Sequence, residues 1–152
     1  LAARDQPHMV FLEVCQGNPT FQMRLEVGAR VPYGMTALGR AYHCGLPEAA
    51  RAAMLEEHRK TGRQEDWEGF RASFEKAVRE YQKNGFCVSL GEWNKDVYSV
   101  AVPLVSRDHS KILALTCAGP PFEMTRSRIF EEIGPRLIQL RDRLFTATGG
   151  SF

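Results

Sequence analysis

Two consecutive apolar stretches, residues 97–105 and 111–119, sort their side chains by size. Because side chains alternate across a β-strand, every second residue of each stretch shares a face. One face carries large apolar side chains. The opposite face carries small ones, namely Val97, Ser99, Ala101, Ala114, Thr116 and Ala118. The polar residues 106–110 between the stretches indicate a turn, so the pattern predicts neighbouring antiparallel strands.

The apolar stretch at residues 86–90 adds a third strand to this expected sheet. Its alternation places Cys87 and Ser89 on the small face if the larger residues point to the main core. A face of Ser, Ala and Thr side chains is typical of two structures: a helix packed very close, or a pocket whose hydroxyls orient a small guest. The strand pattern alone leaves both open.

Helical patterns flank these strands. Residues 67–83 carry one apolar stripe at three- and four-residue steps, and Gly85 is expected to end that helix. Another helix is expected to begin at Pro47. A long amphipathic helix is expected over residues 124–145, with a bend or interruption at residues 134–135, a Gly-Pro pair.

Residues 8–16 and 21–28 read as two strands joined by a Gly-Asn-Pro turn, which predicts a hairpin. The order of strands, helices, strands and helix then predicts an α+β domain with helices packed against an antiparallel sheet. A chain of 152 residues, 43% of them hydrophobic, is long enough to bury one substantial core, so we expect a single domain.

The charge pattern narrows the range of partners. Twenty basic and eighteen acidic residues give a net charge of +2 without a long run of like charges, so we expect no nucleic-acid binding by these residues alone. No apolar run approaches the roughly 20 residues that span a bilayer, and the first residues lack the order of a signal peptide. We therefore expect a cytoplasmic protein, with a further segment upstream of Leu1.

The cysteines and histidines give no support for a metal or redox site. The cysteines are widely spaced and form no CxxC pair, namely Cys15, Cys44, Cys87 and Cys117. The histidines show neither HxH nor HExxH spacing. The chain also lacks a nucleophile with an adjacent base and paired carboxylates on one face. The sequence therefore predicts reduced core thiols, no metal or cofactor, and no catalysis.

The segment VPYGMTALGRAY, residues 31–42, predicts a helix that begins near Thr36 with unusually small residues. The first N–H groups of a helix are unpaired and carry a partial positive charge, so Ala37 and Leu38 suit an anion such as a carboxylate. The alternative is that Thr36 caps its own helix and Gly39 only permits close packing.

Three longer stretches occur in the order LEVGARVPYGMTALGRAYHCGLPE, VREYQKNGFCVSLGEWNKDVYSVAVPLV and ALTCAGP. Together they resemble the effector-binding domain of IclR-type transcriptional regulators, and the likeness covers nearly all of the chain. The resemblance implies a GAF-like domain over residues 1–152 that senses a small organic molecule, usually an acid. It also implies a homodimer or homotetramer, and DNA binding through an N-terminal winged helix-turn-helix that this chain lacks.

The resemblance also implies where the effector binds. The backbone N–H groups of Ala37 and Leu38 would hold its carboxylate, which agrees with the argument from the helix start. The other pocket positions carry over onto Met23, Val31, Ser89, Val97, Ser99, Thr116 and Ala118. Ser89 stands where relatives often have an aspartate, and Tyr33 and Met35 add bulk near the mouth. These departures favour a mono- or aromatic carboxylate with few hydroxyls.

Some alternatives stay open. The GEWNKD segment, residues 91–96, is either a lid or rim of the pocket or a turn anchored by a buried Trp93. An enzyme on the same scaffold, such as a methionine-sulfoxide reductase, would use Cys87 on the pocket face, whereas Cys117 is expected to point the other way. A purely structural oligomerisation module would have a helix filling the small face.

Overall fold

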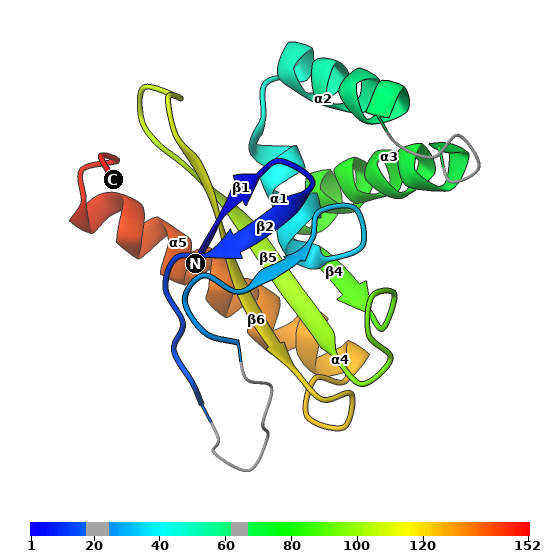
Figure 1. Cartoon of the computed structure of the whole chain (residues 1–152). Coiled ribbons are helices and arrows are strands. Elements are labelled where there is room, and N and C mark those ends of the chain that lie inside the picture. Colours follow the sequence, from blue (N-terminus) through cyan, green and yellow to red (C-terminus); the bar gives the residue numbers. More distant parts are fainter. Residues whose placement is uncertain (18–24, 62–66) are drawn as a thin grey trace.

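A computed structural model describes residues 1–17, 25–61 and 67–152. Its centre is an antiparallel sheet with the strand order β3-β2-β1-β6-β5-β4 (Figure 1). The strands are β1 (Ala2–Asp5), β2 (His8–Phe11), β3 (Arg30–Pro32), β4 (Cys87–Leu90), β5 (Tyr98–Val105) and β6 (Ile112–Gly119). The helices are α1 (Ala37–Gly45), α2 (Glu48–Thr61), α3 (Trp67–Asn84), α4 (Arg126–Arg128), the π-helix η2 (Ile129–Ile133) and α5 (Gly134–Ala147).

Different helices cover the two faces of the sheet. Helix α1 packs on β4, β5 and β6 and contacts α3, whereas α5 packs on β5 and β6 from the other side (Figure 1). This is the α+β arrangement that the sequence predicts. No helix within the described ranges combines the length and apolar character that crossing a membrane would take.

The sorting of side chains by size is confirmed. On the large face, Val100 and Leu115 belong to an apolar cluster that includes Ile129 of η2. On the small face, Ala101 and Ala114 belong to a second cluster with residues of α1. The predicted antiparallel pairing also holds, because β5 pairs with β4 on one side and β6 on the other.

The N-terminal hairpin differs from the prediction. Strand β2 pairs with β1 and β3, and the turn between β1 and β2 contains Gln6 at a φ of 56°. Residues 25–28, the described part of the second predicted strand, form no strand, and Val27 is 64% exposed. The prediction was wrong there: Leu25 is half-buried against the core but Val27 is not, so the alternation gives these residues no continuous buried face.

The predicted helix boundaries are close to those observed. Helix α2 begins directly after Pro47, and α3 ends at Asn84. The following Gly85 has a φ of 79°, and its N–H donates to the carbonyl of Tyr81 at 2.7 Å. A left-handed glycine at this position is a common end of a helix.

The C-terminal helical region is interrupted near the predicted Gly-Pro pair. The π-helix η2 lies directly before Gly134, and the next residue, Pro135, has no N–H to donate to the preceding turn. A Cβ on Gly134 would lie 2.4 Å from Cε1 of Phe86. This glycine therefore lets the helix approach the large face closely.

Candidate functional site

The small face of the sheet is covered unevenly. Strand pairing places Ser89, Ser99 and Ala118 side by side across β4, β5 and β6. The next pair on this face, Cys87 and Ala101, is fully buried in the cluster that contains α1. Ser99 and Ala118 are only half-buried. Helix α1 thus fills one part of the face and leaves Ser99 and Ala118 less covered, while Ser89 in the same row is buried.

The N-terminal end of α1 lies at this row. The Ser89 hydroxyl is 3.0 Å from the carbonyl oxygen of Met35, which comes shortly before the helix. At the other end, a Cβ on Gly45 would lie 2.9 Å from Pro103 and 3.0 Å from Ile112. The helix therefore runs along the small face with its positive end towards Ser89.

Contacts in and just before the first turn of α1 explain why Thr36 and Gly39 occupy their positions. Thr36 has extended backbone angles, and its Oγ1 accepts from the N–H of Gly39 at 3.2 Å. A Cβ on Gly39 would lie 1.8 Å from the carbonyl oxygen of Tyr33, so only glycine fits there. The N–H groups of Ala37 and Leu38 have no acceptor among the described residues. The cap thus leaves free the two amides for which the sequence predicts an anion.

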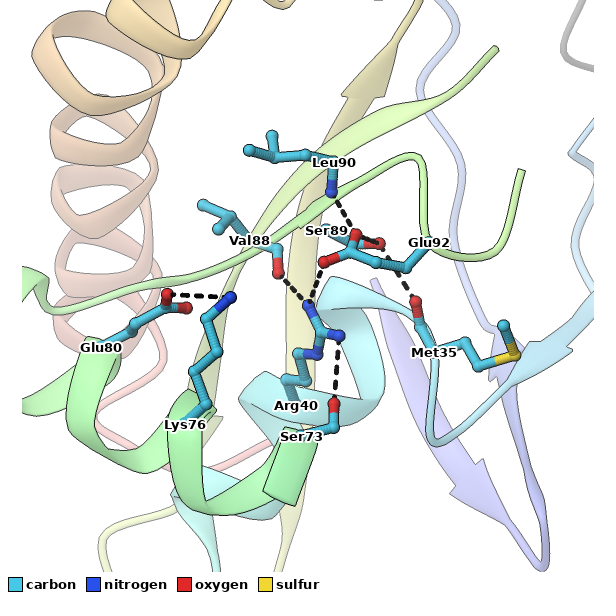
Figure 2. A network of polar contacts seen from close by, with 9 residues as sticks. All are labelled: Met35, Arg40, Ser73, Lys76, Glu80, Val88, Ser89, Leu90 and Glu92. Atoms are coloured by element: carbon cyan, nitrogen blue, oxygen red, sulfur yellow. Dashed lines mark hydrogen bonds and ion pairs between the residues drawn. The ribbon is translucent and has the colours of Figure 1, made fainter. Parts of the chain in front are cut away.

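A polar network lies beside this helix start (Figure 2). The Ser89 hydroxyl is 2.8 Å from Oε2 of Glu92 as well as 3.0 Å from the Met35 carbonyl. Its single hydrogen serves one of these acceptors at a time. The N–H of Leu90 also donates to Oε2 of Glu92. The Glu92 carboxylate is therefore held at the end of β4, next to the small face.

Arg40 completes the network from α1 (Figure 2). Its Nη1 donates to the carbonyl of Val88 at 2.6 Å and to Oε1 of Glu92 at 3.2 Å, and its Nη2 donates to Oγ of Ser73 at 3.1 Å. Strand β4 is the last strand of the sheet, so the Val88 carbonyl and the Leu90 N–H belong to its free edge. The Arg40–Glu92 ion pair hydrogen-bonds both groups: Arg40 donates to the Val88 carbonyl, and Glu92 accepts from the Leu90 N–H.

The two partners of this ion pair differ in burial. Arg40 is only 9% exposed, and its Nε has no hydrogen-bond partner in the described part of the chain. The Glu92 side chain is 40% exposed. Burial by itself raises the pKa of the Glu92 carboxyl, but the Ser89 hydroxyl and the Arg40 guanidinium outweigh it, and the pKa is lowered.

Residues 1–143 match the family described as bacterial transcriptional regulator IclR C-terminal. The chain belongs to this family.

Individual IclR relatives support the assignment. A curated relative, the HTH-type transcriptional regulator TsaQ1/TsaQ2 of Comamonas testosteroni, is 30% identical over 142 residues, which are 92% of this chain and 51% of the relative. The structure of an IclR family transcriptional regulator from Brucella abortus is 38% identical with a TM-score of 0.88, covering 96% of this chain and 55% of that one. The chain thus spans about half the length of these relatives.

A more distant structure has the same fold. It is the inducer-binding domain of a double mutant of the PobR transcription factor from Acinetobacter, in complex with 3-hydroxybenzoic acid. The identity is 18% and the TM-score is 0.65, and the match covers 94% of this chain and 84% of the PobR chain.

The other expected pocket residues of this IclR domain are spread over the sheet. Val97 is 9% exposed and directly precedes β5, and the half-buried Thr116 of β6 donates its hydroxyl to the carbonyl of Val100 at 2.9 Å. Val31 is buried on β3, at the opposite edge of the sheet from Ser89. Met23 lies outside the described residues.

Two aromatic residues were expected at or near the mouth of the pocket, and the structure places them differently. Tyr33 is 4% exposed, stacks on Phe74 and lies 3.2 Å from Nδ1 of His43, so it belongs to the core and not to a pocket mouth. Trp93 is 40% exposed, so of the two alternatives for residues 91–96 the structure rules out the turn anchored by a buried Trp93. Tyr33 is buried because its apolar contacts come from Phe74 of α3.

The structure brings together two thiols that the sequence does not connect. Sγ of Cys44 on α1 lies 3.6 Å from Sγ of Cys87 on β4. The contact with Cys44 and burial raise the pKa of the Cys87 thiol well above its usual range. Cys117 packs on the large face as predicted, and burial raises its pKa as well. Raised pKa values oppose the thiolate that an enzyme would need.

A cavity of about 290 Å³ lies at the other end of α1. Cys44, Gly45, Tyr81 and Arg141 are among its lining residues, and none of the predicted effector-binding residues lines it.

The sequence reasoning missed Arg40 as a site residue. One feature of the sequence could have indicated its role: Arg40 is the only Lys, Arg, Asp or Glu within α1, a helix made mostly of small and apolar residues.

Proposed function

We propose that this chain is the effector-sensing domain of a cytoplasmic IclR-type regulator, and that a small carboxylate binds at the N-terminal end of α1. The observation that carries the proposal is the pair of acceptor-free amides, Ala37 and Leu38, beside the half-buried Ser99 and Ala118. Unpaired N–H groups at a helix start attract an anion. Family membership supplies the regulatory context.

The domain acts by binding and not by catalysis. An effector that binds one arrangement of a homodimer or homotetramer better than another shifts the assembly by no more than the difference in its affinities. DNA binding by a winged helix-turn-helix outside these residues would follow that shift. The raised pKa of Cys87 supports a sensor over the alternative thiol enzyme.

The effector class follows from the side chains around the amides. Ser89, Ser99 and Thr116 offer hydroxyls, while Val97 and Ala118 offer apolar contact. The Thr116 hydroxyl already donates to Val100, so only the two serine hydroxyls remain for a guest, which are few for a hydroxyl-rich one. An aromatic monocarboxylate fits this balance, and the PobR domain holds one, 3-hydroxybenzoic acid.

The test is a thermal-shift screen of carboxylates, including 3-hydroxybenzoate, with 3-hydroxybenzamide as the uncharged control. At about 100 times its Kd, a true ligand raises Tm by roughly 5–10 °C. Ala37→Pro removes one amide, and the extended Thr36 before it tolerates a following proline. This variant should lose the response, whereas Ala37→Gly, which keeps the N–H, should retain it.

Because Ala37 is fully buried, a proline there can disturb packing, so Ser99→Leu provides a second variant on the half-buried part of the face. It should also block binding by filling the site. If no acid stabilises the parent, or if both blocking variants respond as the parent does, the carboxylate site is not at this end of α1.

A further inference from the structure

The Glu92 carboxylate occupies the place at which an acidic guest would meet Ser89 (Figure 2). Its Oε2 is 2.8 Å from the Ser89 hydroxyl, which is itself 3.0 Å from the carbonyl of Met35 at the entry to α1. Ser89 pairs directly with Ser99 in the sheet. One hydroxyl therefore links this internal carboxylate both to the helix start and to the small face.

We propose that Glu92 is an internal competitor of the effector: it neutralises Arg40 and engages Ser89 in the free domain, and an anionic effector binds by displacing it from both. The inference rests on the proposed function, since it concerns the same site. It adds Arg40 as the counter-ion of the effector and Glu92 as the residue that sets how tightly an acid binds.

The first argument is charge. An effector carboxylate beside Ser89 would also lie beside the ionised Glu92, and two like charges at hydrogen-bonding range disfavour each other. The described part of the chain gives Glu92 a single cationic partner, Arg40, at 3.2 Å. That guanidinium cannot fully neutralise two carboxylates, so binding of the acid and retention of Glu92 oppose each other.

The second argument is that Glu92, and not Arg40, is the partner that is able to leave the ion pair. Arg40 is nine-tenths buried and is anchored by the Val88 carbonyl and the Ser73 hydroxyl, so it stays in place and needs an anion beside it. Glu92 is 40% exposed and lies in a loop whose residues 92–96 are all exposed. It is therefore able to exchange Arg40 for water while the incoming acid keeps Arg40 paired.

The third argument is unused donor capacity. Arg40 has five N–H donors, and its buried Nε has no partner among the described residues. A guanidinium commonly binds a carboxylate through two parallel hydrogen bonds. Arg40 thus keeps a donor that Glu92 does not satisfy.

The test measures the Kd of 3-hydroxybenzoate for the parent chain and for Glu92→Gln, which keeps the hydrogen-bonding shape and removes the charge. The expected result is a Kd lower by about tenfold or more in Glu92→Gln. Glu131→Gln, the same change at an exposed position on η2, should bind as the parent does. The Kd of the uncharged 3-hydroxybenzamide should not change in either variant.

A second variant tests Arg40. In the Glu92→Gln background, Arg40→Gln leaves no unpaired buried charge, so the fold is spared the cost of an isolated ion. This double variant should lose the gain in acid affinity. Equal binding by the double and single variants would overturn the role of Arg40.

The outcomes separate the two proposals. If the parent binds the acid and Glu92→Gln binds it equally or more weakly, the competition is overturned while the effector site stands. If the parent, Glu92→Gln and Glu131→Gln all fail to bind any acid of the screen, both proposals fall together.

Discussion

The two faces of the sheet are closed in different ways. On the large face, Val100 and Val102 are fully buried by apolar side chains from η2 and α5. On the small face, α1 comes so close that a Cβ on Gly45 would lie 2.9 Å from Pro103 of β5 and 3.0 Å from Ile112 of β6. One face is filled by side-chain volume, and the other by a close approach of backbone.

This difference separates stability from binding. The apolar side chains on the large face stabilise the fold in proportion to the apolar area that they bury, and they offer no hydrogen-bonding group to a polar ligand. The close packing of α1 on the small face buries less apolar area, but it leaves backbone amides, hydroxyls and the Arg40–Glu92 ion pair at the N-terminal end of the helix. Substitutions on the large face should therefore change unfolding alone, and substitutions on the small face should also change acid binding.

The largest expected effect is on the large face. Ile129→Ala removes a fully buried side chain and should lower the free energy of unfolding by about 2–5 kcal/mol in urea denaturation. Leu140→Ala on α5, where the side chain is 46% exposed, should cost less than about 1 kcal/mol. Both variants should keep the parent's Kd for 3-hydroxybenzoate. A tenfold change in that Kd would show that the faces are not independent.

The next effect is at the N-terminal end of α1, the helix that covers the small face. Gly39→Ala forces α1 away from the Tyr33 carbonyl, so it should cost about 1–3 kcal/mol and also weaken acid binding, because the amides of Ala37 and Leu38 move with the helix. Gly69→Ala is the matched control in α3, where an added Cβ has open space, and it should stabilise by about 0.5–1 kcal/mol. Calorimetric titration and urea denaturation measure both properties. Unchanged acid binding in a destabilised Gly39→Ala would contradict the site.

These elements also show what the sequence was able to predict. The two-residue period fixes which side chains share a face, so the meander and its faces followed from residues 97–119 alone. The helix start at Thr36 and the helix end at Gly85 were readable because capping is local chemistry. The first hairpin was not, because its turn places Gln6, a residue without a turn preference, in a left-handed conformation.

The polar part of the site was harder to predict. Arg40 and Glu92 are 52 residues apart, and Cys44 and Cys87 are 43 residues apart. Neither pair has a spacing that marks it, because each forms only when α1 packs on β4. Ser89 was predicted as a site residue, but the carboxylate that engages it was not. The side chains at the site were therefore predictable individually, and their pairing was not.

A smaller effect is expected from the dependence of stability on pH. The pKa of the Glu92 carboxyl is lowered in the fold, so its contribution to stability is present above the unfolded pKa of about 4.3 and is lost as the pH falls through the folded value. The parent should exceed Glu92→Gln in stability by less than about 1 kcal/mol at pH 7, because the carboxylate is partly exposed. The difference should shrink as the pH is lowered and vanish below the folded pKa. A difference that grows on acidification would contradict the ion pair.

The smallest effect is expected from the reactivity of the thiols, since Cys87 lies on the small face and Cys117 on the large face. Iodoacetamide near neutral pH should label the exposed Cys15 first and the half-buried Cys117 slowly, while Cys87 should remain unlabelled until the chain unfolds. Burial raises the pKa of Cys117, and the contact with Cys44 together with burial raises that of Cys87, so neither supplies much thiolate. Cys15→Ser, monitored by mass spectrometry, removes the background label. Fast labelling of Cys87 in that variant would show an activated thiol beside α1 and favour the thiol enzyme over the sensor, because close backbone packing alone gives a buried cysteine no reason to react.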